Sequence, residues 1–273
     1  MHILKSIEEN SSIPRLIHQT FQTKNIPPEF EENVNRIKAM NPDWHHQIYD
    51  DEDILAFLTE YCDPGILNYY NRINPKYGAA KADLFRYLLL YKFGGVYLDI
   101  KSTINFPLDS ILKSDDQYLL TQWKNKPGEK HEGWGMSPYL KNVPGGEFQQ
   151  WHVVASPGHP FLKAVIEKVL SNIDHYNPWV HGTGGNGVLR VTGPIAYTEA
   201  IYPLMPYHKH RFATDAELGF DYTIFKNSSH KPLFKSHYTK HTEPVIKLRG
   251  IAGISASIYS FLKRTKRDLL KNK

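Results

Sequence analysis

The segment Ala79–Lys101 (AAKADLFRYLLLYKFGGVYLDIK) constrains the fold of this chain more than any other stretch. Apolar side chains recur in it at a spacing that places them on one face of a helix: Ala82, Phe85, Leu89 and, less strictly, Phe93. Gly94 and Gly95 predict the end of that helix, because glycine adopts positive φ angles without a Cβ penalty. A β-rich run follows and stops at Asp99. The segment therefore predicts a helix that leads directly into a strand of an α/β sheet.

Three charged residues accompany this helix–strand unit. Asp83 and Arg86 are three residues apart, so they share a helix face and can contact each other or a common ligand. Asp99 lies at the C-terminal edge of the strand, where ligands of α/β sheets usually bind. The alternative is a buried helix–strand pair with solvated ends. The order of acidic and basic residues around the double glycine favours a ligand site.

Strands and helices alternate along most of the chain, without internal repeats or low-complexity linkers. The predicted strands are 13–21, 44–49, 116–121 and 151–155, and the predicted helices are 28–40, 51–61 and 161–173. Two segments are predicted loops, 124–146 and the glycine-rich 181–187, the second bordering an acceptor site. Short strands are expected near 221–225 and 245–248. This alternation predicts one α/β domain with a mostly parallel sheet over residues 1–250 and a tail over 251–273.

The charged unit resembles part of a known family. Asp83–Tyr87 followed by LLLYKFGGVYLDIK resembles the "DLxRY…LYxxGGxYxDxD" segment of glycosyltransferases related to family 32. Four further blocks are similar to segments of these enzymes and occur in the same order: IPRLIHQTF (13–21), NPDWHHQIYDDED (41–53), ASPGHPFL (155–162) and VTGPIAYTEAI (191–201). The group includes the yeast initiating α-mannosyltransferase and many bacterial enzymes of capsule and lipopolysaccharide synthesis.

The resemblance implies both a fold and a reaction. The fold would be a GT-A-type, Rossmann-like α/β domain with a mostly parallel central sheet flanked by helices and an irregular C-terminal appendage. The reaction would be retaining transfer of a hexose or N-acetylhexosamine from a UDP- or GDP-sugar to a bacterial surface glycan or glycolipid. The alternative is a catalytically inactive protein of the same fold that binds a sugar nucleotide or a glycan.

One position departs from the family pattern. In these enzymes an Asp-x-Asp binds a divalent cation that bridges the donor's phosphates, but here the pair is Asp99 and Lys101. Either Mn²⁺ or Mg²⁺ is held by Asp99 and a later ligand, for which we expect His237, or the Lys101 ammonium contacts phosphate directly. A surface lysine beside a structural aspartate is the third interpretation.

The resemblance also assigns roles to other residues. Asp83 and Arg86 would hold the sugar and the phosphate of the donor, with Asp99 completing the catalytic group. Donor binding is expected from Tyr97, Lys101 and three residues of the first strand: Ile17, Gln19 and Phe21. Phe21 could stack on the base or belong to the core, and Tyr97 could line the site or pack on the sheet.

The net charge of +5 is concentrated at one end of the chain. Residues 263–273 hold six Lys/Arg and one Asp, which accounts for the whole net charge. Six residues of the tail, all but one of them apolar, fall near one helical stripe: Ile254, Ile258, Phe261, Leu262, Thr265 and Leu269. Such a basic amphipathic helix can lie on an anionic membrane surface, or its stripe can pack on the protein body. Nucleic-acid binding is disfavoured, because no stacking aromatics accompany the basic residues.

The composition of the chain favours certain cellular locations over others. The chain has 273 residues, 41% of them hydrophobic, and no apolar run of 18 residues, so we expect no membrane span and no secretion signal. The single cysteine, Cys62, fits a reducing compartment. We therefore expect a cytoplasmic protein; the family resemblance implies a bacterial one, peripheral at the inner face of the cell membrane if the tail binds lipid.

Overall fold

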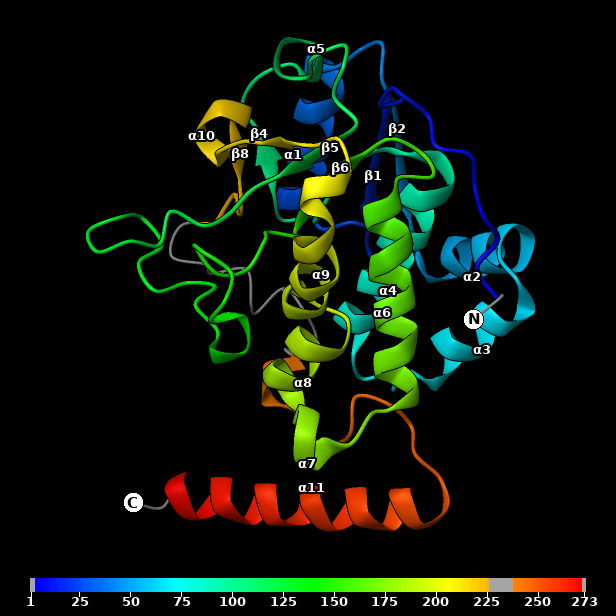
Figure 1. Cartoon of the computed structure of the whole chain (residues 1–273), viewed down its shortest axis with the longest axis vertical. Helices are drawn as coiled ribbons and strands as arrows, with labels where there is room; N and C mark the ends of the chain where they lie inside the picture. Colours follow the sequence, from blue (N-terminus) through cyan, green and yellow to red (C-terminus); the bar gives the residue numbers. More distant parts are fainter. Residues whose placement is uncertain (1–2, 226–237, 272–273) are drawn as a thin grey trace.

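The computed structural model describes residues 3–225 and 238–271 and contains one central six-stranded sheet (Figure 1). The strand order is β2-β1-β3-β6-β5-β7. Their bounds are β1 Leu16–Thr20, β2 His45–Tyr49, β3 Gly95–Leu98, β5 Tyr118–Leu120, β6 His152–Ala155 and β7 Arg211–Phe212. All run in one direction except β6, which is antiparallel to both neighbours. The predicted mostly parallel α/β sheet is confirmed.

The helices surround this sheet and form the base of the molecule (Figure 1). Their bounds are α1 Pro28–Met40, α2 Asp51–Tyr61, α3 Pro64–Arg72, α4 Gly78–Phe93, α5 Leu108–Ile111, α6 Pro160–Asp174, α7 Pro178–His181, α8 Gly184–Val191, α9 Pro194–Ile201, α10 Asp215–Leu218 and α11 Gly250–Lys271. A small second sheet pairs β4 (Thr103–Ile104) with β8 (Phe220–Asp221). The described residues also form 3₁₀ helices at Pro138–Leu140, Tyr202–Tyr207 and Tyr238–Lys240.

The alternation of side chains along the strands creates two hydrophobic layers. In β3, Tyr97 joins the layer built on α4, α6 and α9, whereas Val96 and Leu98 join the opposite layer with α1 and α5. Helix α4 lies between the sheet and α6 and is buried on every side, from Asp83 through Tyr91. The one-sided apolar face predicted for this helix is therefore wrong, because later helices cover its other face.

The double glycine joins α4 to β3 without an intervening loop. Gly94 has φ +67° and Gly95 has φ +102°, both in the region that favours glycine. A Cβ on Gly95 would lie 2.6 Å from the Leu16 carbonyl oxygen, so the residue also permits close approach of β1. This tight junction fixes Asp99 directly after β3, with its N–H donating to the Trp151 carbonyl at 2.8 Å.

Three local predictions differ from the structure. The glycine-rich 181–187 is not a loop throughout, since α8 begins at Gly184. Residues 245–248 contribute only an isolated bridge, Ile73 to Ile246, and the strand expected near 221–225 is β8, which ends at Asp221. The long segment 124–146 is irregular apart from one 3₁₀ turn, as predicted.

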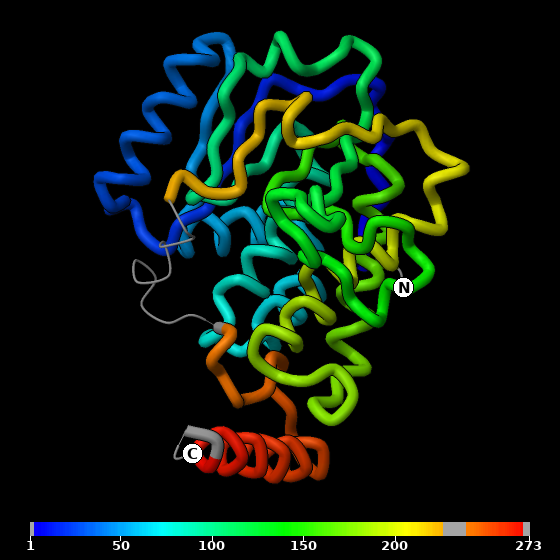
Figure 2. The backbone as a smooth tube through the Cα atoms, turned by 90° about the vertical axis from the view of Figure 1, so that its left-hand side faces the viewer, coloured from blue at the N-terminus to red at the C-terminus, as the bar shows by residue number. Residues whose placement is uncertain are grey.

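The C-terminal helix α11 lies across the lower end of the molecule, beneath α7 and α8, in both views (Figures 1 and 2). It contacts α7, where Trp179 packs on Tyr259 at 5.0 Å between ring centroids. Among the described residues, no helix has the length and apolar character needed to cross a bilayer.

Candidate active site

Four charged residues meet where β3 ends. Arg86 Nη2 lies 3.2 Å from Asp83 Oδ1 and 3.2 Å from Asp99 Oδ1. Lys101 Nζ lies 2.5 Å from the other Asp99 oxygen, Oδ2. Helix α4 supplies the first two residues and the turn after β3 supplies the others, so the double glycine brings the two groups together. We call these four residues the charge cluster.

Arg86 is the centre of this cluster and its donors are fully engaged. Its Nη1 donates to the carbonyl and the side-chain oxygen of Gln150 at 2.6 and 2.9 Å, and its Nε donates to the Ala82 carbonyl at 3.4 Å. The guanidinium lies 4.4 Å from the centroid of the Tyr97 ring. With Nη2 shared between the two carboxylates, the five N–H groups of a guanidinium are accounted for. Arg86 therefore orients its neighbours.

Asp83 is also held entirely by protein. Its Oδ1 accepts from Gln150 Nε2 at 3.2 Å as well as contacting Arg86, and its Oδ2 accepts from Thr192 Oγ1 at 2.8 Å. Burial raises the pKa of this carboxyl, and Arg86 and Thr192 oppose that rise. Because the Asp83 side chain is 4% exposed and both of its oxygens contact protein groups, the geometry suits positioning better than the direct sugar contact implied by the resemblance.

Asp99 is the most exposed residue of the cluster, and Lys101 is buried beside it. The Asp99 side chain is 23% exposed, against 9% for Lys101, 5% for Arg86 and 4% for Asp83. Burial lowers the pKa of Lys101 and the adjacent Asp99 raises it, with a net upward shift that keeps the ammonium charged. Its Nζ also lies 4.3 Å from the centroid of the Tyr222 ring. Among the described residues the ammonium has one hydrogen-bond acceptor, Asp99, for three N–H donors.

The residues described here do not fit a resident divalent cation. No group of three or more His, Cys, Asp or Glu side chains in the described ranges could hold a metal ion. Asp99 supplies one carboxylate, whose two oxygens contact cationic groups, and the position of the family's second carboxylate holds an ammonium. Hard cations need several oxygen ligands, and an ammonium repels them. The expected ligand His237 lies outside the described residues.

Two of the predicted donor residues, Gln19 and Tyr97, lie beside the charge cluster, whereas Phe21 and Ile17 pack elsewhere. Gln19 and Tyr97 adjoin the cluster, since Gln19 Nε2 lies 3.5 Å from the Asp99 carbonyl and the Tyr97 ring lies against Arg86. Tyr97 is buried, and its hydroxyl is hydrogen-bonded to Thr20 Oγ1 at 2.9 Å. Phe21 packs on Phe30 of α1, with ring centroids 5.8 Å apart.

Ile17 does not line a surface. It is fully buried, and its strand β1 is paired with β2 on one side and β3 on the other. The expectation that Ile17 contacts the donor is therefore not supported by its position, because neither its side chain nor its ladder hydrogen bonds are available.

Sequence reasoning missed three residues of the site. Gln150 and Thr192 hold Asp83, and Tyr222 covers Lys101. Thr192 begins the Thr-Gly-Pro turn between α8 and α9, whose resemblance to the family was a usable signal. Gln150 and Tyr222 belong to no recognisable pattern, and the fold alone brings them to the cluster.

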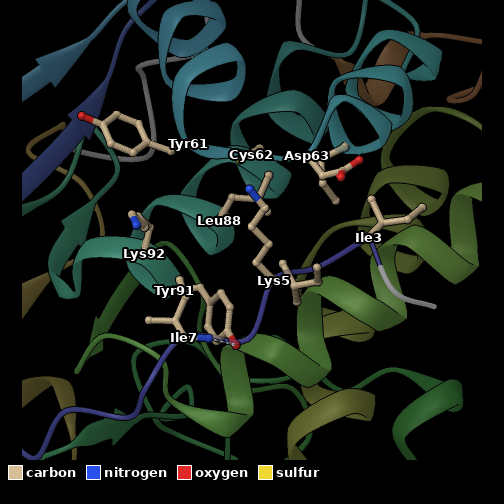
Figure 3. Close-up of a pocket in the computed structure, with 11 residues that line it drawn as sticks. Ile3, Lys5, Ile7, Tyr61, Cys62, Asp63, Leu88, Tyr91 and Lys92 are labelled. Atoms are coloured by element: carbon tan, nitrogen blue, oxygen red, sulfur yellow. Dashed lines mark hydrogen bonds between the residues drawn. The ribbon is translucent and has the colours of Figure 1, made fainter.

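A small pocket elsewhere in the molecule is separate from this site (Figure 3). It lies between the N-terminal segment, the end of α2 and helix α4, and its lining includes Ile3, Lys5, Tyr61, Cys62 and Leu88. Burial raises the pKa of the Cys62 thiol to about 11, so this cysteine is not poised as a nucleophile. The pocket contains no residue of the charge cluster.

A charge cluster at the carboxyl end of a central strand, on a mostly parallel sheet, is the arrangement expected of a GT-A glycosyltransferase. Residues 27–118 match the family described as "Glycosyltransferase sugar-binding region containing DXD motif". The solved structure titled "PaToxG Glycosyltransferase" superposes with a TM-score of 0.52, covering 72% of this chain and 71% of that one at 18% identity. That superposition supports the GT-A fold.

Fungal mannosyltransferases are among the similar sequences. "Inositol phosphoceramide mannosyltransferase 3" of Schizosaccharomyces pombe is 34% identical over 189 residues, 68% of this chain and 44% of that protein. "Initiation-specific alpha-1,6-mannosyltransferase" of Candida albicans is 26% identical over 218 residues, 72% of this chain and 54% of that protein. The chain thus spans about half the length of these relatives. Together the comparisons support a glycosyltransferase, but none of these relatives is a bacterial capsule or lipopolysaccharide enzyme.

Proposed function

We propose that this protein transfers a sugar from a nucleoside diphosphate to an acceptor hydroxyl, with Lys101 contacting the diphosphate. The observation that carries the proposal is the Asp99–Lys101 pair at the end of β3, which Arg86 holds in place from α4. Asp99 is partly exposed and connects this buried cluster to the surface. Within residues 3–225 and 238–271, Lys101 has one hydrogen-bond acceptor for three donors, whereas all Arg86 donors are engaged, so of these two cations we choose Lys101 as the phosphate ligand.

The chemistry needs stabilisation of the leaving group. The bond between the anomeric carbon and the β-phosphate oxygen breaks, and the acceptor oxygen bonds to the same carbon. The diphosphate gains negative charge as it leaves, and a charge-assisted hydrogen bond from Lys101 offsets that charge in a largely desolvated position. Retention of configuration, implied by the family resemblance, places the acceptor on the face of the leaving group, where a phosphate oxygen takes its proton.

The roles of the other residues follow from their contacts. Asp99 pairs with Arg86 through one oxygen and with Lys101 through the other, so it holds the Lys101 ammonium in place for the diphosphate. Asp83 and Arg86 act as positioning residues, because their polar atoms are taken up by Gln150, Thr192 and each other. The Mn²⁺ or Mg²⁺ that the resemblance implies stays a prediction, and no step of this proposal passes through it.

The names of the relatives narrow the substrates we propose. Enzymes named for mannosyl transfer favour a mannose donor, hence GDP-mannose among the UDP- and GDP-sugars expected from the sequence. Those named for inositol phosphoceramide favour an acceptor with a lipid anchor. A bacterial surface glycan and a cytoplasmic location, expected from the resemblance and the composition, stay predictions.

Aromatic residues beside Lys101 offer a surface for the acceptor. Tyr222 packs edge-on against Trp123 at 5.3 Å and Trp134 at 6.1 Å, measured between ring centroids. Trp134 is 43% exposed and lies in the irregular segment 124–146. A broad exposed ring next to the reaction centre suits the apolar face of a sugar. We therefore expect Trp134→Ala to raise the acceptor KM severalfold while donor hydrolysis without acceptor is unchanged.

The proposed activity is tested by incubating the protein with UDP- and GDP-sugars and measuring nucleotide release, with and without an inositol phosphoceramide acceptor. We expect release from one donor, with at least a hundredfold loss in Asp99→Asn. Asp221→Asn, at an exposed carboxylate paired with Lys130, is the control and should retain activity. If no donor is turned over but GDP or UDP binds, the protein is a sugar-nucleotide binder, and the transferase proposal is wrong.

A further inference from the structure

Helix α11 presents its apolar stripe away from the protein. The stripe residues are strongly exposed: Ile251 87%, Ile254 65%, Ile258 52%, Phe261 66%, Leu262 51% and Leu269 64%. Helices on a globular protein normally bury such a stripe against the core. The alternative that this stripe packs on the protein body is therefore wrong.

The contact with the body is made by polar and small residues and by Tyr259, which packs on Trp179. Ala256 and Ser260 are the buried residues of the helix. Lys263 Nζ donates to the carbonyl and hydroxyl oxygens of Thr183 at 3.0 and 2.7 Å, and Arg267 Nη1 donates to the Lys240 carbonyl at 2.9 Å. At 3.6 residues per turn, these four positions lie on the side of the helix opposite the apolar stripe. The docking contacts thus orient the stripe outward.

Two further basic residues flank the stripe. Arg264 and Lys266 are exposed and fall on either side of it in the helical projection. In both views α11 lies at the end of the molecule with its axis across that end, and none of the drawn helices or strands lies beyond it (Figures 1 and 2). Asp268 lies on the same side as Arg264 and is paired with Arg267. An exposed apolar face with Arg264 on one side and Lys266 on the other, on a helix of 22 residues, matches an interfacial helix.

We propose that α11 is a membrane-docking helix that binds an anionic lipid surface. The apolar stripe enters the boundary between headgroups and acyl chains, while Arg264 and Lys266 extend to lipid phosphates. We favour a lipid surface over a second molecule of this protein as the binding partner of α11. Two α11 helices facing each other would bring like charges together. The proposal is independent of catalysis, and it would bring the body of the enzyme to a lipid-anchored acceptor.

Vesicle sedimentation with the full chain tests the proposal, using phosphatidylcholine vesicles with and without phosphatidylglycerol. We expect binding to the anionic vesicles that weakens as salt rises. The double change Ile258→Asp with Phe261→Asp should abolish binding, and these side chains are outward-facing, so the fold is kept. Tyr207→Asp, at a 77% exposed tyrosine on another surface, is the control and should bind normally.

A second double variant tests how much the basic residues of α11 contribute to vesicle binding. Arg264→Gln with Lys266→Gln should weaken partitioning into anionic vesicles about 30-fold, from the contribution of each basic residue near such a surface. Equal binding to neutral and anionic vesicles would overturn the proposed lipid class. Absence of vesicle binding would overturn the proposal, as would a native dimer in solution that Ile258→Asp with Phe261→Asp converts to a monomer.

Discussion

Lys101 occupies the position where the resembled enzymes carry a second metal-binding carboxylate, and this one residue changes the electrostatics of the site. The exchange replaces a negative group with a positive one beside Asp99. A buried ion pair gains little net stability, because desolvation offsets most of the Coulomb attraction. Retaining such a pair at the edge of a central strand is more readily explained by ligand binding than by stability.

A buried histidine, His18, is expected to make the stability of the fold sensitive to acid. His18 is buried, donates through Nε2 to the Gly94 carbonyl at 3.0 Å and accepts through Nδ1 from the Tyr49 hydroxyl at 3.1 Å. Burial lowers its pKa from 6.5 to about 4, so the unfolded chain binds the proton more tightly. Stability is therefore present above pH 6.5 and lost as the pH falls toward 4, by up to about 1.4 kcal/mol per pH unit.

Urea unfolding at pH 7 and pH 5 checks this effect. His18→Gln should show a smaller fall in the free energy of unfolding between the two pH values than the native chain. His175→Gln, at an exposed position, should match the native pH dependence. An unchanged pH dependence in His18→Gln would show that this histidine does not carry the effect.

At the scale of elements, the α4–β3 junction depends on its glycines. A Cβ on Gly95 would approach the Leu16 carbonyl oxygen to 2.6 Å and Leu16 Cβ to 2.9 Å, in addition to the strain of its positive φ. We expect Gly95→Ala to destabilise the fold by about 2 to 3 kcal/mol in urea unfolding. Gly78→Ala, at the start of the same helix with open space around its Cβ, should change stability by less than about 1 kcal/mol. Equal effects would contradict the role of the junction.

Sequence patterns predicted the helices and strands that depend on residue spacing and backbone preference within the segment itself. The helix, the double glycine and the strand ending at Asp99 follow from spacing and backbone preference, and they place the charge cluster. Helix α8 could not be predicted this way, because glycine is a poor helix former. A Cβ on Gly184 would lie 2.7 Å from the His241 carbonyl oxygen, and one on Gly187 would lie 2.7 Å from a Val245 methyl. Close packing against a distant segment therefore selects glycine there.

At the scale of the whole molecule, the fold assembles the site from segments far apart in the sequence. Asp83 is held by Gln150 and Thr192, 67 and 109 residues away along the chain. No periodicity or motif encodes such contacts, so the sequence predicted the charged residues of the site but not the residues that hold them. The outward stripe of α11 likewise depends on which face meets the body, which composition does not determine.

Calorimetric titration with GDP and UDP in EDTA tests directly whether Lys101 binds the diphosphate of the donor. We expect the native chain to bind one nucleotide without metal, and Lys101→Met to bind it about 10- to 100-fold more weakly. Lys101→Arg, which keeps the charge, should recover part of the affinity, with melting curves confirming that both variants fold. Lys168→Met, which removes a lysine paired with Glu199 on the surface, should bind as the native chain does. Binding that requires added Mn²⁺, or that survives in Lys101→Met, would contradict the account.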